Sequence, residues 1–79
     1  MGVQVQGVTE NYATLANAII LQAVKDYRDA LKKLKRNPRN TSALKDKSDV
    51  ERFFSSGWYG ELTTVDGEML LRKLQQEVE

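Results

Sequence analysis

The chain has 79 residues, with 12 Lys and Arg, 11 Asp and Glu, no His and no Cys, which gives a formal net charge of +1. Without His and Cys it has no disulfide, no thiolate or imidazole metal site, and neither the commonest general base nor the strongest nucleophile of enzymes. A chain this short buries only about 60% of the surface that its unfolded form exposes, so we expect stabilisation by self-association.

The first nine residues alternate weakly, with Val3, Val5 and Val8 between Gln and Gly. A strand without a neighbouring strand is unstable, so we expect residues 1–9 to form a flexible or strand-like arm outside a helical domain at residues 10–79. This segment lacks the basic and apolar regions of a signal peptide. No apolar run reaches the roughly 18 residues of a membrane span, which predicts a protein that does not associate with membranes.

Residues 10–36 have the composition and periodicity of one long helix. Ala, Leu, Lys, Arg and Gln dominate, and neither Gly nor Pro interrupts the segment. Thr9 is the expected N-cap. Asn37-Pro38 ends the helix, because the residue before a proline is disfavoured in the α conformation. Apolar residues recur three and four positions apart along one face: Ala16, Ile20, Ala23, Tyr27, Leu31 and Leu34.

The length of this helix predicts self-association. About 27 residues at roughly 1.5 Å each span about 40 Å, whereas a compact domain of this size is only about 30 Å across. The apolar face is also wider in the first half of the helix than two short helices can cover. We therefore expect a homodimer or higher homo-oligomer, formed by antiparallel pairing of this helix. The expected interface residues are Leu15, Ile19, Ile20, Val24 and Tyr27.

Two shorter helices are expected in the second half of the chain. One spans residues 41–56, or starts afresh at Ser48, where the sequence Ser-x-x-Glu matches a capping box. A short helical turn at residues 58–62 precedes the last helix, which Thr63 or Thr64 caps. The expected fold class is therefore all-α, a small three-helix domain with one long N-terminal helix through which it oligomerises.

Four of the six aromatic residues lie close together, at Phe53, Phe54, Trp58 and Tyr59. A platform for nucleotide bases would expose such rings beside cations, but a minimal core depends on large aromatic side chains. We therefore assign Phe53, Phe54 and Trp58 to the core, with Trp58 closing the angle between the second and last helices. Tyr59, beside Gly60, is expected to be exposed.

The segment KKLKRNPR places five cations in eight positions at the end of the long helix. Residues 25–47 carry nine Lys and Arg against three Asp, whereas residues 48–79 carry three Lys and Arg against seven Asp and Glu. A basic cluster suits the phosphates of a nucleotide or nucleic acid, or another anionic partner. Cations are also favoured at any helix C-terminus, so a purely structural role stays open. The expected ligand- or partner-binding residues are Lys32, Lys33, Lys35, Arg36, Arg39 and Tyr59.

The sequence offers little for catalysis. Carboxylate pairs such as Glu61 with Asp66, and Asp66 with Glu68, are typical of an acidic helix, where they cap the helix or keep it soluble. The glycine motifs that cradle phosphates and the spacing of a calcium-binding loop do not occur in the sequence. We expect no enzyme, no catalytic residue, no cofactor and no metal.

Two blocks of the sequence carry a resemblance to a known group of proteins. They are ANAIILQAVKDYRDALKKLKRNPRN at residues 16–40 and ERFFSSGWYGELTTVDGEMLLRKLQ at residues 51–75. Together they resemble short, uncharacterised proteins encoded by phages and other mobile elements of Gram-positive bacteria. The resemblance supplies no functional residues. It implies the cytoplasm of a bacterial host cell, where small phage proteins often block host defence.

These features suggest a non-enzymatic, phage-type interaction protein. We expect it to inhibit a host pathway, in the first place anti-phage defence, by stoichiometric binding of a host protein or a nucleotide signal. Mimicry of DNA is disfavoured because the chain is nearly neutral and has a basic middle. Two alternatives remain: a small nucleic-acid-binding regulator that uses residues 32–39, and a structural subunit of a phage assembly.

Overall fold

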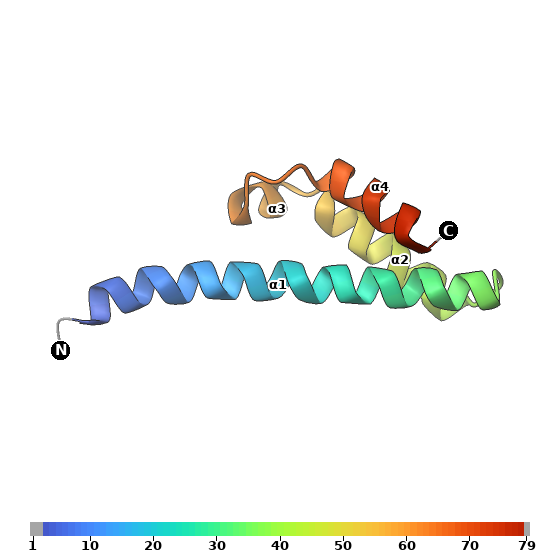
Figure 1. Ribbon diagram of the computed structural model, residues 1–79, viewed down its shortest axis with the longest axis horizontal. Helices are drawn as coiled ribbons and strands as arrows, with labels where there is room; N and C mark the ends of the chain where they lie inside the picture. Colours follow the sequence, from blue (N-terminus) through green and yellow to red (C-terminus); the bar gives the residue numbers. More distant parts are fainter. Residues whose placement is uncertain (1–2, 79) are drawn as a thin grey trace.

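One long helix, α1 (Val3–Arg36), forms the axis of the protein, and three shorter helices pack along it from about its middle to its carboxyl-terminal end (Figure 1). This computed structural model describes residues 3–78, and the surroundings of the side chains from Tyr12 to Val78. The shorter helices are α2 (Thr41–Phe54), α3 (Gly57–Leu62) and α4 (Gly67–Val78). The all-α class is thus confirmed, although the fold has four helices where we expected three. The molecule measures 53 × 21 × 19 Å along its principal axes.

The start of α1 differs from our expectation. The helix begins at Val3, so residues 3–9 continue it and the strand-like arm is wrong for them, while Met1 and Gly2 lie outside the described residues. Thr9, the expected N-cap, is an interior residue of the helix. The physical reason is cooperativity, because adding a residue to an existing helix avoids the cost of a new nucleus. At the other end, α1 stops at Arg36, directly before Asn37-Pro38, as expected.

Side-chain caps set the starts of the shorter helices. Asn40 precedes α2 and its side-chain oxygen accepts a hydrogen bond of 3.0 Å from the backbone N–H of Ala43, so Ser48 lies inside one continuous helix. Ser56 caps α3 in the same way. The cap of α4 is Asp66, whose Oδ1 accepts from the backbone N–H of Glu68 at 3.0 Å. The expected threonine caps of α4 are therefore wrong.

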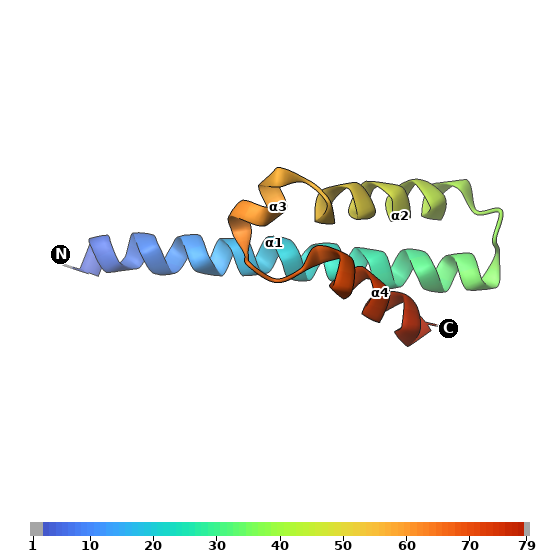
Figure 2. The ribbon, with the colours of Figure 1, turned by 90° about the horizontal axis from the view of Figure 1, so that it is seen from above.

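The core lies where α2, α3 and α4 meet the second half of α1. Seen from above, α2 and α4 run on either side of the α1 axis (Figure 2). The buried cluster at their centre consists of Val24, Tyr27, Val50, Phe54, Tyr59, Leu71 and Leu74. These side chains come from all four helices, so the short helices are held mainly by burial of apolar surface against α1.

A polar network crosses this core. The hydroxyl of Tyr27, which is fully buried, donates to Oε2 of Glu51 at 2.7 Å and accepts from Nε2 of Gln75 at 2.9 Å. Lys47 also donates to the same Glu51 oxygen at 2.7 Å. The network therefore links α1, α2 and α4 through one hydroxyl group. Satisfying that hydroxyl matters, because a buried polar group without a partner costs about 1–3 kcal/mol.

One glycine is required by a close approach between helices. A Cβ atom added to Gly67 would overlap the carbonyl oxygen of Phe54 and lie 3.2 Å from the ring of Tyr59. Gly67 is buried at the first turn of α4, so its missing side chain lets α4 start directly against the end of α2.

Candidate binding groove

An open apolar groove lies between the middle of α1 and the end of α2. Its volume is about 440 Å³ and its walls are largely apolar. On the α1 side the wall consists of Leu15, Ala18, Ile19, Gln22 and Ala23. The opposite wall consists of Val50, Phe53 and Trp58, and Asp26 and Asp49 stand at one end. The groove can therefore bind an apolar group, and its own charged side chains lie at one end only.

Trp58 is the main exposed aromatic side chain of the groove. It is 55% exposed, and its ring meets the ring of Phe53 edge to face with centroids 5.5 Å apart. Our assignment of Trp58 to the core is therefore wrong. The reason is local, because Ser56 caps α3 and fixes the phase of this six-residue helix, which turns Tyr59 inward and Trp58 outward. Phe54 is buried and Phe53 is half-buried, as expected for core residues.

Tyr59 also differs from our expectation. It is 3% exposed and packs against Phe53 and Phe54 with ring centroids 5.7 Å and 5.1 Å away. Its hydroxyl has no hydrogen-bond partner among the residues that the structure describes. Burial, and secondarily the negative charge of Asp66, raises the pKa of this hydroxyl. Tyr59 is thus a core residue and no part of an exposed ligand site.

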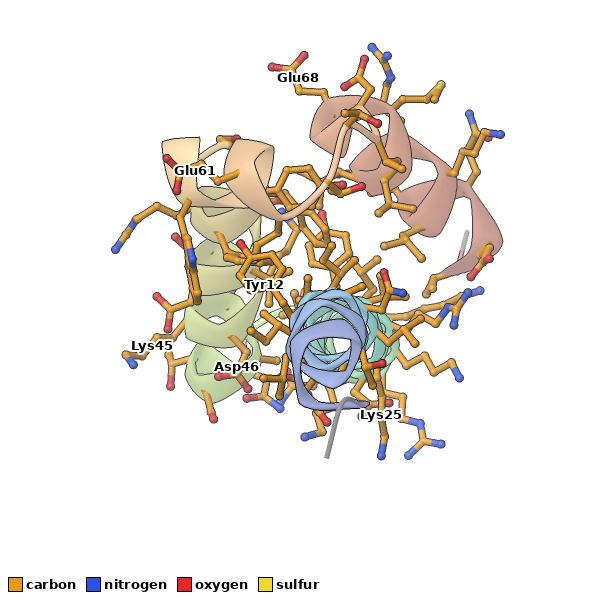
Figure 3. The ribbon with its side chains drawn as sticks, turned by 90° about the vertical axis from the view of Figure 1, so that its left-hand side faces the viewer. Tyr12, Lys25, Lys45, Asp46, Glu61 and Glu68 are labelled. Carbon is orange, nitrogen blue, oxygen red and sulfur yellow. The ribbon has the colours of Figure 1, made fainter. Side chains whose placement is uncertain are left out.

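The first half of α1 carries exposed apolar side chains that no other helix covers. Tyr12 is 59% exposed and Leu15 is 61% exposed. Figure 3, which looks along α1 from its amino-terminal end, shows Tyr12 on the side of α1 that faces α2 and α3, while Lys25 points away from them. The chain has no charged residue from Asn11 to Val24. This lack of charge is unusual for an exposed helix, and exposed apolar patches are typical of interaction sites.

The expected interface residues fall into two groups. Leu15 and Ile19 line the groove. Val24 and Tyr27 are buried in the core of the same chain, and Ile20 packs against that core. The burial of Val24 and Tyr27 leaves neither side chain free for the main contact with another copy, whereas Ile20 is half-buried. The periodicity of α1 does not separate the two groups, because both faces are apolar and adjacent on one helix.

The basic run lies at the far end of α1 from the groove. Lys35 donates to the carbonyl oxygen of Val78 at 3.1 Å. Lys32 lies close enough to Glu77 to help lower the pKa of that carboxyl, after the larger effect of the hydrogen bond from Arg28. These two cations therefore help hold the end of α4 against α1.

The three remaining cations of the run, Lys33, Arg36 and Arg39, are exposed and form no ion pair among residues 3–78. They keep a basic surface at this end of the molecule. The structure does not bring the run together with Tyr59, which lies buried beside α2 and α4.

Sequence reasoning missed Trp58 and Ala18 as groove residues, and Tyr12 as an exposed apolar residue of α1. The signal that could have found the α1 side is the uncharged stretch from Asn11 to Val24. No comparable signal marks Trp58, because its exposure depends on the phase of α3.

Among residues 3–78, no group of three or more Asp and Glu side chains is placed to hold a metal ion. Nor is any helix in this range long and apolar enough to cross a membrane. Comparison with protein-family models, curated proteins and solved structures finds no match for this chain.

Proposed function

We propose that the chain is a non-enzymatic interaction protein that acts by stoichiometric binding. The observation that supports this function is the uncharged, exposed first half of α1, which continues into the apolar groove beside Trp58. A surface of this kind is costly to leave in water and is typical of protein contacts. Apart from the carboxylates of Asp26 and Asp49 at one end, the groove contains no side chain that commonly acts as a nucleophile or general base.

Self-association through the first half of α1 is part of this proposal. Its contact residues are the exposed Tyr12 and Leu15 and the half-buried Ile19, in place of the buried Val24 and Tyr27. A homodimer or higher homo-oligomer is the assembled form in which the protein acts.

The resemblance to phage and mobile-element proteins supplies the setting. In that setting the assembled protein inhibits a host pathway, such as anti-phage defence, in the bacterial cytoplasm. The contact with the host component is made by the exposed cations at the end of α1, Lys33, Arg36 and Arg39, with Lys32 and Lys35 beside them. That component therefore presents an anionic surface or is an anionic nucleotide.

Native mass spectrometry of the protein from cells with an active defence system tests the proposal. We expect mass in excess of whole multiples of the 9.0 kDa chain. The triple variant Lys33→Glu, Arg36→Glu, Arg39→Glu should lose this extra mass. A matched control with the same charge change, Lys25→Glu, Arg52→Glu, Arg72→Glu, alters exposed cations elsewhere and should keep it.

The function is contradicted if the control variant loses the bound component as completely as the triple variant, or if the wild-type protein carries none. Relief of phage restriction in a plaque assay should follow the same order. Turnover of a nucleotide or peptide by the purified protein would argue for an enzyme instead.

A second candidate is nucleic-acid binding, which the three cations without ion pairs favour. For each phosphate contact of this kind, the binding constant for duplex DNA falls almost in proportion to the rise in salt concentration. Fluorescence anisotropy with duplex and single-stranded oligonucleotides at two salt concentrations separates the two functions. Absence of binding at low salt removes the second candidate.

A further inference from the structure

We propose that each groove is filled by the first half of α1 from a second copy of the chain, in an antiparallel dimer. The partner helix lies between Leu15 and Ile19 on one wall and Phe53 and Trp58 on the other. A single copy therefore leaves its groove unfilled, and the α1 of the second copy fills it. This inference rests on the proposed self-association and gives its direction and register.

The chemistry of the groove selects this occupant. Of the chain's 12 basic and 11 acidic residues, only Glu10 lies before Lys25. Tyr12, Leu15, Ile19 and Gln22 also follow the alternating spacing of three and four residues that is typical of paired helices. An apolar groove favours a helix that presents uncharged side chains at this spacing. The first half of α1 is such a helix.

The shape of the molecule selects the antiparallel direction. The shorter helices lie over α1 from about its middle to its carboxyl-terminal end and leave its amino-terminal part bare (Figure 1). In a parallel dimer the two copies of α2 would stand at the same level beside the seam and keep the long helices apart. In an antiparallel dimer the bare half of each α1 lies against the covered half of the other.

The lengths of the two halves agree with this arrangement. The 14 residues of α2 span about 21 Å along α1 at roughly 1.5 Å per residue. The part of α1 from Val3 to Ile19 spans about 26 Å on the same basis. Each bare half is therefore long enough to reach the end of the partner's groove.

The absence of cysteine from the sequence allows a direct test of register. If the two-fold axis passes between Leu15 and Ile19, Tyr12 of one copy lies opposite Gln22 of the other. We expect a disulfide-linked dimer when Tyr12→Cys and Gln22→Cys proteins are mixed and oxidised, and none when either is oxidised alone. Both side chains are exposed, so neither change should disturb the fold of the chain.

Two leucines of similar exposure provide a second, matched test. Leu15 lies in the groove and is 61% exposed, whereas Leu21 is 66% exposed and does not line the groove. Leu15→Asp should raise the dimer dissociation constant about tenfold or more, because it buries an unpaired charge. Leu21→Asp should change it by less than about threefold. Analytical ultracentrifugation measures both.

The outcomes separate this inference from the function it rests on. Cross-linking of each cysteine variant alone indicates a parallel dimer and overturns the antiparallel register, while self-association stands. A dimer that none of these cysteines cross-links, or equal effects of the two leucine variants, overturns the groove as the interface. A chain that stays monomeric overturns both the register and the self-association, whereas stoichiometric binding of a host component is judged separately by the extra mass.

Discussion

Replacing Tyr27 by Phe should lower the free energy of unfolding by about 2 kcal/mol at pH 7. The change keeps the buried ring but removes the hydroxyl that donates to Glu51 at 2.7 Å. A hydrogen bond to a charged group contributes about 1.5–3 kcal/mol. The second partner, Gln75, is exposed, so its amide regains a hydrogen bond to water and adds little to the loss.

The pH dependence of stability tests the surroundings of the same hydroxyl in a second way. Burial, followed by the interactions with Glu51, raises the pKa of Tyr27 from 10.0 to about 12. One unit of pKa equals about 1.4 kcal/mol. The rise therefore sets an upper limit of about 2.7 kcal/mol on the stability that the folded protein loses when this hydroxyl ionises at high pH. The stabilisation is present in full below pH 10 and is lost as the pH rises towards 12, because the folded state keeps the proton longer than the unfolded state.

Urea unfolding followed by circular dichroism measures both effects, at one fixed protein concentration because self-association would also stabilise the fold. The difference between wild type and Tyr27→Phe should shrink steadily from pH 9 to pH 12. Tyr59→Phe is the matched control. It removes a buried hydroxyl that has no partner in the described structure, so it should leave stability unchanged or raise it by up to about 1 kcal/mol. Equal losses for the two variants, or a Tyr27 difference that does not change with pH, would refute the network as a source of stability.

Three further predictions concern local features of the fold. Gly67→Ala should destabilise the protein by about 1–3 kcal/mol, because the new methyl group meets the backbone of Phe54. Gly60→Ala, which has open space around it, should be neutral or stabilise by up to about 1 kcal/mol, and thermal unfolding of the two variants compares them directly. Asn40→Ala removes the cap of α2 and should cost about 1 kcal/mol in urea unfolding, whereas Asn40→Gly should cost only a few tenths. Burial opposes ionisation of Glu51, but its hydrogen bonds outweigh this and lower its pKa below 4.5, so this stabilisation is present above about pH 4.5 and is lost as the pH falls further. Glu51→Gln should therefore show a smaller loss of stability between pH 6 and pH 3 than wild type, and an equal loss would contradict the assignment.

Trp58 and Tyr59 illustrate where prediction from the sequence failed. The aromatic cluster was correctly recognised as a source of core residues, and Phe54 occupies the core. Which of two adjacent aromatic residues points inward depends on the phase of α3, and Ser56 sets that phase by capping the helix one residue before Gly57. A shift of one residue on a helix turns a side chain by about 100°, which is enough to exchange a buried position for an exposed one.

Tyr27 also shows a limit of prediction from the sequence, in this case for contacts between helices. Its place on the apolar face of α1 is evident from spacing, but the identity of the surface that covers it is not. The chain turns back after Leu62 and places α4 beside α1, so Gln75 and Leu74 cover Tyr27 from within the same copy. We therefore place the proposed interface at Tyr12, Leu15 and Ile19, which lie nearer the start of α1, away from α4.

Taken alone, the sequence determined the properties that depend on local chemistry. Helix propensity and the Asn37-Pro38 stop determined the all-α class and the end of α1, and the missing His and Cys excluded the usual thiol and imidazole chemistry. Only the tertiary structure decided which half of α1 stays bare, which aromatic side chain reaches the surface and which cations stay exposed. These depend on how α3 and α4 fold back over α1, and contacts between residues distant in the chain leave little trace in local periodicity.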